Sequence, residues 1–354
     1  MIRITFPPDP AEHVAFTYSP VLECVLSLHV LVGPKHHALQ HGWVRQMRGL
    51  DPALRRRIDE LAPLYRWTLP GLLLPEPSGD AESFGSELER ILSLSPEMQL
   101  ESLGRPLYDH GGAGPDVFGE RAVRETMVER GGELAELLLA DPAAATRRLC
   151  DLLADYWDAA FAAEWSRIEP KLAGAVVESG RALASTGIWA VLGRLPARCR
   201  PSRERNELAI DLPHDHDLEI SDANPLVLSP SVFTWPHLRV NCDPPWPTAI
   251  VYAAPSVARD AAPRIPPDEL LRVLRALGDD TRLRILKLIA ERPRTTQELG
   301  PLVGLTAAGL SKSLRRLADA GLVTSHREGY YIVYTLEPSR IADLSETVER
   351  FLAR

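Results

Sequence analysis

The sequence predicts an α+β protein with a mainly helical N-terminal domain, which includes an antiparallel β section, and a smaller C-terminal domain. The chain has 354 residues, more than one typical domain, and 45% of them are hydrophobic, which suffices for a buried core. Apolar residues recur at helical spacing along most of the chain, whereas short β-type runs fill residues 207–253. An Ala- and Pro-rich stretch then precedes residues 268–354, which form the second domain.

The beginning of the N-terminal domain is expected to be helical after a short extended segment. The Pro-rich residues 1–20 predict a strand or an extended arm, and the strongly apolar residues 21–32 predict a buried helix. Asp51-Pro52 and Asp141-Pro142 each mark a helix start, because Asp can cap a helix and Pro fits its first turn. Further helices are expected over residues 86–94, 96–103, 120–130 and 168–183, with loops over 74–85 and 110–116.

Near the end of this domain the apolar pattern changes from helical spacing to short β-type runs. Within residues 207–253 the β-type runs are separated by Pro, Asp and Asn, which predicts an antiparallel sheet or stacked hairpins. Residues 255–267 are rich in Ala and Pro, so we expect a linker there. The predicted domains are therefore residues 1–254 and 268–354.

Charge and cysteine usage indicate a cytoplasmic protein. The net charge is −8, but residues 264–354 carry 15 Lys and Arg against 12 Asp and Glu, a net of +3. The N-terminus lacks the basic and apolar pattern of a signal peptide, and no apolar run is long enough to cross a bilayer. The four cysteines have neither disulfide-framework nor zinc-ligand spacing: Cys24, Cys150, Cys199 and Cys242. An acidic body with a mildly basic end suggests an anionic partner for the C-terminal domain.

The C-terminal domain has the most regular pattern, which predicts helix, helix, short helix, helix, hairpin and helix. Its expected inner faces are Leu270, Val273, Leu274 and Leu277 on the first helix, Leu283, Leu286 and Ala290 on the second, and Leu310, Leu314 and Leu317 on the fourth. Thr295 with Glu298 is the pattern of a capping box at the start of the third helix. Thr306 can cap the fourth helix, and Gly321 can end it in the left-handed conformation. The hairpin strands are expected over 322–326 and 330–336, joined by residues 327–329.

Two helices joined by a tight turn and followed by a hairpin make a winged helix-turn-helix, whose second helix enters the major groove of DNA. Such a helix needs an apolar inner face and short polar or basic side chains outside, so that its backbone can approach the bases. The residues that meet this requirement are Thr306, Ala307, Ala308, Ser311, Lys312 and Arg315. Lys312 and Arg315 can reach phosphates or guanine edges, and Thr306 and Ser311 can bond phosphates or bases. The alternative is an ordinary solvated helix face, and the preceding turn and following hairpin favour DNA binding.

Residues 270–336 resemble the ArsR/SmtB family, the winged-helix repressors known for arsenic and metal resistance. The resemblance rests on three sequence segments: "LRALGDDTRLRIL" (274–286), "TAAGLSKSLRRLADAGLV" (306–323) and "HREGYYIVYTL" (326–336). The resemblance implies a winged-helix fold, homodimerisation and DNA binding. The chain is also similar to longer regulators in which a large N-terminal domain precedes such a winged helix.

The sequence departs from this family at the positions that would sense metals. The family's metal sensors carry Cys-Val-Cys at the start of the short third helix, where Thr295, Thr296 and Gln297 stand here. Soft-metal sensing needs thiolates, and none is present in this domain. The family's Arg after the wing Gly is Tyr330 here, so Arg327 is the better wing contact to phosphate. We therefore expect no metal site and no cofactor.

Four other features of the sequence each have a functional and a simpler interpretation. Residues 213–217, "PHDHD", can hold a metal through His214 and His216, and a polar hairpin turn is favoured. His37 and His41 can share a helix face as a ligand pair, and surface or core histidines are favoured. The Gly-rich loop 110–116 lacks the phosphate-loop ending. An aromatic pocket is the less favoured interpretation of a helix that carries Tyr156, Trp157, Phe161 and Trp165.

We expect a transcriptional regulator, not an enzyme, that represses by binding a pseudo-palindromic operator as a homodimer. Phosphate contacts are expected from Arg292, Arg294, Lys312, Arg315, Arg316 and Arg327. Tyr330 of the wing is a further candidate DNA contact. The apolar stripe of the closing helix is expected to form the dimer contact rather than only a core: Ile341, Leu344, Val348 and Phe351. The N-terminal domain would dimerise or sense an unknown small-molecule effector, and no membrane partner is expected. The alternative is a metal-dependent enzyme centred on residues 213–217 and fused to a DNA-binding tail.

Overall fold

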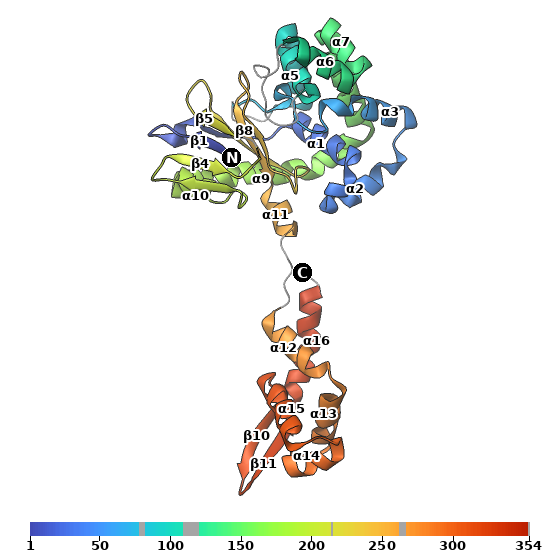
Figure 1. Cartoon of the computed structure of the whole chain (residues 1–354), viewed down its shortest axis with the longest axis vertical. Helices are drawn as coiled ribbons and strands as arrows, with labels where there is room; N and C mark the ends of the chain where they lie inside the picture. The colour runs from blue at the N-terminus through green and yellow to red at the C-terminus, as the bar shows by residue number, and fades with distance from the viewer. Residues whose placement is uncertain (78–81, 109–119, 214, 262–266, 353–354) are drawn as a thin grey trace. The chain divides into compact units, whose positions relative to one another are not determined.

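The computed structural model describes residues 1–77, 82–108, 120–213, 215–261 and 267–352. The chain divides into two compact units, Met1–Ala262 and Pro263–Arg354, each with its own secondary structure (Figure 1). Among the helices described, none combines the length and the apolar character needed to cross a membrane.

Helices make up most of the first unit and surround a large apolar core. The α-helices are α1 (Pro20–Val32), α2 (His41–Gln46), α3 (Pro52–Leu61), α4 (Phe84–Ser93), α5 (Pro96–Tyr108), α6 (Glu120–Gly131), α7 (Glu133–Ala140), α8 (Pro142–Tyr156), α9 (Ala162–Thr186), α10 (Ile188–Leu192) and α11 (Pro255–Ala261). Short 3-10 helices are η1 (Pro10–His13), η2 (Pro34–His36), η3 (Ala38–Gln40), η4 (Met47–Gly49), η5 (Ala62–Leu64) and η6 (Gly71–Leu73), and a π-turn, η8 (Trp157–Phe161), joins α8 to α9. The predicted caps are confirmed, since the carboxylates of Asp51 and Asp141 accept backbone N–H bonds at the starts of α3 and α8.

Two four-stranded sheets form the rest of the first unit. The first has the order β3 (Cys199–Ser202), β4 (Glu207–Ile210), β1 (Ile2–Thr5), β5 (His216–Glu219). The second has the order β2 (Val14–Phe16), β6 (Leu226–Ser231), β8 (Thr248–Ala253), β7 (Arg239–Asn241). The expected antiparallel β section is confirmed only in part, because both sheets are mixed. The pairs β1–β4, β3–β4 and β7–β8 are antiparallel, whereas β1–β5, β2–β6 and β6–β8 are parallel. Strands from the first 16 residues complete both sheets, which local spacing within 207–253 could not reveal.

The second sheet is buried on both faces and separates two cores. Leu226, Leu228 and Ile250 pack against residues of the first sheet and α10, whereas Val227 and Val251 pack into the helical core. A strand buried on both sides carries consecutive apolar residues instead of an alternation. This explains the unbroken apolar stretches of β6 and β8, which are typical of central parallel strands.

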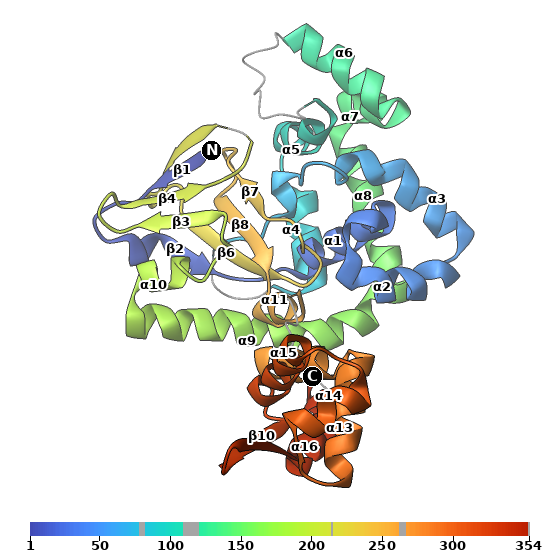
Figure 2. The ribbon, with the colours of Figure 1, turned by 60° about the horizontal axis from the view of Figure 1, so that its bottom comes forward.

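Helix α9 connects the helical part of the first unit with the sheets (Figure 2). Ile168 near its start belongs to the helical core, and Leu183 near its end packs against the core between the sheets. The expected linker over 255–267 is partly wrong, because Pro255–Ala261 forms α11. Val257 of α11 packs with Leu172 of α9, so the first unit extends beyond residue 254.

The second unit has the predicted order of elements with one additional strand. It consists of α12 (Asp268–Leu277), α13 (Asp280–Glu291), β9 (Arg294–Thr295), α14 (Thr296–Val303), α15 (Ala307–Asp319), β10 (Val323–Glu328), β11 (Tyr331–Leu336) and α16 (Pro338–Leu352). The sheet order is β10–β11–β9, in which Thr295 pairs with Val333. The hairpin turn predicted at residues 327–329 was placed too early in the sequence. Glu328 pairs with Tyr331, so the hairpin turns at Gly329 and Tyr330.

The predicted inner faces of the first two helices of this unit are confirmed only in part. Leu274 is 43% exposed and Leu283 is 49% exposed, and Ala290 is also exposed. Leu270, Val273 and Leu286 are buried as predicted, and the core also takes Ala276 from α12 and Ile285 and Ile289 from α13. Leucine occurs on both sides of α12 and α13, so leucine positions alone could not define the buried face.

A buried arginine joins α12 to α13. Arg282 is 6% exposed, and its guanidinium donates from Nε to the Ala276 carbonyl at 2.6 Å and from Nη2 to the Arg275 carbonyl at 2.8 Å. Its Nη1 lies 3.3 Å from a carboxylate oxygen of Asp279. A cation at a helix C-terminus satisfies carbonyls that have no intrahelical partner and interacts favourably with the helix dipole.

Replacing Arg282 with Ala should therefore loosen the second unit. We expect Arg282→Ala to lower the free energy of opening of α12 and α13 by about 2 kcal/mol or more, because buried carbonyls lose charged hydrogen-bond donors. Hydrogen exchange of peptides from residues 268–291 in the full chain measures this change. The control is Arg284→Ala, whose exposed ion pair with Asp280 should contribute less than about 1 kcal/mol. Equal effects of the two substitutions would contradict the structural role of Arg282.

Candidate nucleic-acid interface

The predicted groove-entering helix is α15, and it is anchored by its leucines as expected. Leu310, Leu314 and Leu317 are each at most 2% exposed and lie in the core of the second unit. The turn before α15 passes through Gly304, whose φ of 74° lies in the left-handed region. Thr306 caps the helix, since its Oγ1 accepts from the Gly309 backbone N–H at 3.3 Å. The orientation of α15 is therefore set by its own unit.

The opposite face of α15 is open to solvent. Every residue selected on this helix from the sequence is exposed: Thr306, Ala307, Ala308, Ser311, Lys312, Arg315 and Arg316. Within the part of the chain that the structure describes, Lys312, Arg315 and Arg316 have no ion pair or side-chain hydrogen bond. Three basic side chains without intramolecular partners lose few interactions when they bind an anionic surface.

The wing places two further selected residues in solvent. Arg327 is exposed on β10, with its Nε 3.1 Å from the Gly329 carbonyl oxygen. Tyr330 is 96% exposed at the hairpin turn. Gly329 has a φ of 60°, a conformation that L side chains adopt rarely, and it permits the tight turn.

Two of the arginines expected to contact phosphate have partners within the unit. The side chain of Arg294 is only 12% exposed, and it donates to the Leu288 carbonyl at 2.9 Å and to Glu291 at 3.3 Å. Arg292 pairs with Glu298 at 2.8 Å. The basic residues of the proposed contact surface are therefore Lys312, Arg315, Arg316 and Arg327. The spacing of Arg292 and Arg294 in the sequence did not reveal these carbonyl and carboxylate partners.

Residues 295–298 form the predicted capping box. The backbone N–H of Thr295 donates to Glu298 at 2.8 Å, and the backbone N–H of Glu298 donates to the Thr295 hydroxyl at 3.3 Å. The hydrogen bond from Thr295 and the guanidinium of Arg292 lower the pKa of Glu298 to about 2. Thr295 thus caps α14 at one of the positions where the resemblance would have placed a thiolate.

Comparison with known proteins identifies the family of each unit. Residues 1–258 match the model of a family of unknown function, DUF5937, and residues 279–325 match that of the bacterial regulatory proteins of the arsR family. The chain is an ArsR-family DNA-binding transcriptional regulator. Because the first match spans most of the chain, the regulator also belongs to DUF5937.

The relatives each match about a quarter of the regulator. A probable mercury resistance operon repressor of Streptomyces lividans is 36% identical over 91 residues, which are 26% of this chain and 73% of the relative. The HTH-type transcriptional regulator KmtR of Mycobacterium tuberculosis is 35% identical over 89 residues, 24% of this chain and 68% of the relative. An ArsR-like transcriptional regulator from Rhodococcus has a solved structure with 29% identity and a TM-score of 0.23, covering 24% of this chain and 81% of that one.

The alternative metal centre at residues 213–217 does not assemble among the described residues of the regulator. Asp215 binds the N-terminal ammonium group at 2.7 Å, and Asp217 pairs with Arg3 at 3.2 Å. His214 lies outside the described residues. The favoured hairpin turn is also wrong, because β4 and β5, which flank this segment, are separated in the sheet by β1.

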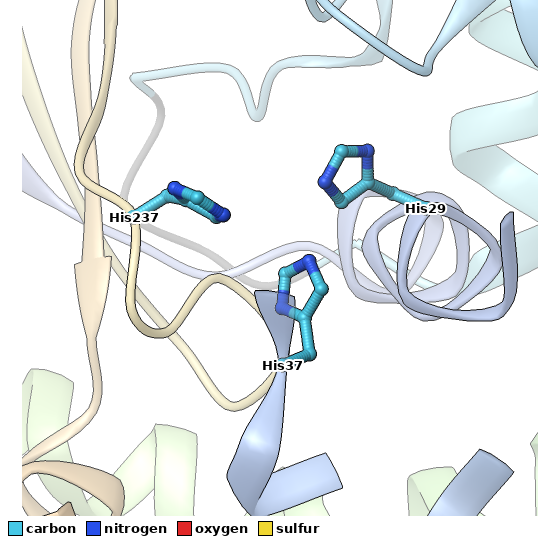
Figure 3. A group of neighbouring side chains, drawn as sticks. All are labelled: His29, His37 and His237. Atoms are coloured by element: carbon cyan, nitrogen blue, oxygen red, sulfur yellow. The ribbon is translucent and has the colours of Figure 1, made fainter. Parts of the chain in front are cut away.

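The favoured interpretation of His37 and His41 as core or surface histidines is confirmed, and the two do not share a helix face. His41 is exposed at the start of α2, whereas His37 lies between η2 and η3 and is 1% exposed. The structure instead brings His37 together with His29 and His237 (Figure 3). Sequence spacing could not reveal this cluster, because its members lie in three separate segments.

The three clustered imidazoles are neutral at neutral pH. Burial lowers the pKa of His29 to about 3 and that of His237 to about 4, with a further contribution from the positive charge of Arg239. Burial also lowers the pKa of His37. Each ring therefore keeps an unprotonated nitrogen.

Of the four aromatic residues between positions 156 and 165, two lie in the core and two line a cavity. Tyr156 and Phe161 are fully buried, as the favoured interpretation expected. Trp157 stacks on Phe84 with ring centroids 3.9 Å apart, and it lines a cavity of about 570 Å³ together with Trp165. The Gly-rich segment 110–116 lies outside the described residues.

The low pKa of Glu298 predicts how pH affects the start of α14. Because the pKa of Glu298 is lower in the folded state than the value of 4.5 in the unfolded state, the ionised carboxylate stabilises the folded state at pH values above 4.5. This contribution is lost as the pH falls from 4.5 to about 2. Glu298→Gln keeps an oxygen that can accept the capping hydrogen bond but removes the titration. Hydrogen exchange of residues 296–303 should lose protection towards pH 2 more in the parent chain than in this variant. An equal loss of protection in the parent chain and in the variant would contradict a stabilising role of the ionised Glu298 in the capping box.

Proposed function

We propose that the protein is a repressor that binds a pseudo-palindromic operator as a homodimer. In this proposal α15 enters the major groove and the β10–β11 hairpin lies along the flanking backbone. The observation that carries it is the division of α15 into a leucine face buried in its own unit and an exposed polar face. The relative from Streptomyces lividans, which is named a repressor, supports repression rather than activation.

The shape of the exposed face supports close approach to base pairs. The N-terminal turn of α15 carries Thr306, Ala307 and Ala308, whose short side chains let the backbone approach the groove floor. One and two turns further, Lys312 and Arg315 have the length and charge to reach guanine O6 and N7. The remaining basic residues, Arg316 and Arg327, would contact phosphates and make binding fall steeply with salt.

Exposed apolar residues support a dimer through α16. Ile341 is 42% exposed on α16, and Leu274 is 43% exposed on α12, which packs against α16. Leu344, Val348 and Phe351 are partly buried. An incompletely covered apolar stripe favours a partner helix, and a two-fold axis there would present two copies of α15 to two half-sites.

The first unit would act by binding rather than by catalysis, either as a sensor or as part of the dimer contact. Two of its cavities, of about 550 and 530 Å³, have the size of small-molecule sites. Arg194, Arg198 and Arg259 line the second of them, which favours an anionic effector. These cavities support a sensing role that does not require catalytic residues.

The groove assignment is tested by Lys312→Ala together with Arg315→Ala. We expect operator affinity to fall by about 1–3 kcal/mol per lost base contact, with folding unchanged because both side chains are exposed. Gel-shift titration at constant salt, on an operator selected from a random library, measures the effect. The control is Arg275→Ala with Lys287→Ala, which removes two exposed charges elsewhere in the same unit. Unchanged affinity of the α15 variant would refute the assignment.

The dimer contact is tested by placing a charge in the apolar stripe of α16. We expect Ile341→Asp to raise the dimer dissociation constant about 100-fold or more, because a carboxylate would be buried against the partner. Analytical ultracentrifugation of the full chain measures it. Ile332→Asp, on the wing at 47% exposure, is the matched control and should leave the dissociation constant unchanged. A dimer that resists Ile341→Asp would place the contact elsewhere.

A further inference from the structure

Three histidine rings converge inside the first unit (Figure 3). His29 is on α1, His37 lies between η2 and η3, and His237 precedes β7. Their rings meet edge to face, with centroids 5.1 Å apart for His29 and His37 and 5.2 Å apart for His37 and His237. One ring nitrogen from each lies within 4.8 Å of those from the other two.

Backbone carbonyls set the tautomers of two of these rings. The Nδ1 of His37 lies 2.9 Å from the Trp235 carbonyl oxygen, and the Nδ1 of His29 lies 3.3 Å from the Tyr65 carbonyl oxygen. A carbonyl only accepts hydrogen bonds, so each Nδ1 carries the proton and each Nε2 keeps its lone pair. This is the arrangement in which protein histidines bind metals, with one ring nitrogen oriented by a carbonyl and the other free to ligate.

The lone pair on Nε2 of His37 accepts no hydrogen bond from the described residues. Its side chain is 1% exposed, and its Nε2 is buried without a hydrogen-bond partner among the described residues. A buried polar atom without a hydrogen-bond partner destabilises the folded state, so such atoms in folded proteins call for an explanation. A ligated cation at the centre of the cluster satisfies this nitrogen.

We propose that the first unit binds one divalent transition-metal ion, of the type of Zn²⁺, through Nε2 of His29, Nε2 of His37 and a ring nitrogen of His237. Ligand nitrogens lie about 2.0–2.1 Å from zinc, so two of them in a tetrahedral site are about 3.3 Å apart. Small side-chain rotations would close the present separations to this value. His237 is the exposed member, so it leaves a route by which the ion enters.

The charge around the cluster defines the remaining ligand. Arg239 stands close enough to influence all three rings, and its Nε is buried without a hydrogen-bond partner among the described residues. Three neutral imidazoles do not offset the charge of a divalent ion beside this guanidinium. The fourth ligand is therefore an anion, such as hydroxide or a carboxylate, which Arg239 can also contact. His237 lines the cavity of about 530 Å³, so an anion bound in that cavity can approach the ion.

This site lies outside the winged-helix unit and uses imidazoles instead of thiolates. It goes beyond the proposed function and does not depend on it, because metal binding can be measured without DNA. Loss of operator binding would leave the metal site untouched, and an absent metal site would leave α15 as the proposed groove helix.

The experiment is a metal titration of the full chain after removal of metals with a chelator. We expect one Zn²⁺ per chain by calorimetry, and one Co²⁺ with visible d–d bands but without the near-ultraviolet band of a thiolate ligand. His237→Ala removes an exposed ligand with little risk to folding and should weaken Zn²⁺ binding at least about 100-fold. Zn²⁺ should also raise the Tm of the parent chain but not that of His237→Ala.

His36→Ala and His216→Ala are the matched controls, because neither histidine belongs to the cluster, and both should bind Zn²⁺ as the parent does. His37→Gln provides a second loss of ligand, with its folding checked by circular dichroism. Absence of stoichiometric Zn²⁺ and Co²⁺ binding overturns the proposal. Unchanged affinity in folded His237→Ala, or equal weakening in the control variants, also overturns it.

Discussion

The DNA-binding unit depends on the burial of one face of a single helix. Leu310, Leu314 and Leu317 hold α15 in the core, and full burial of a leucine contributes about 1.5–3 kcal/mol. Their spacing of four and three residues leaves the other side of the helix without a packing role. That side can therefore carry short and basic residues, which would be costly to bury but which a DNA groove accommodates.

The arginines of this unit illustrate how one side-chain type is used in two ways. Arg282 and Arg294 are nearly buried and donate to main-chain carbonyls, so they stabilise the unit. Arg315 and Arg316 are exposed and unpaired among the described residues, so their charge is available to a partner. Net charge alone does not distinguish these roles, and a count of basic residues overestimates the contact surface.

The first unit brings distant segments together through its two-sided sheet. Because β6 and β8 are buried on both faces, the chain after β6 is held against the helical layer before it returns as β7. That segment contains Trp235, whose carbonyl orients His37, and His237 itself. The histidine cluster is thus a product of the layered packing, and each ring comes from a segment that also serves the core.

Local spacing determined the order of the helices and the hairpin in the winged-helix unit. Capping boxes, leucine repeats and a glycine at a helix end are interactions between residues a few positions apart, so the sequence predicts α14, α15 and the end of α15 at Gly321 correctly. Only the tertiary structure decided which side of α12 and α13 faces inward, that β1 and β2 complete sheets with strands some 200 residues later, and that His29, His37 and His237 meet. The physical reason is that these features arise from contacts between distant segments, whose partners are chosen by packing of the whole unit.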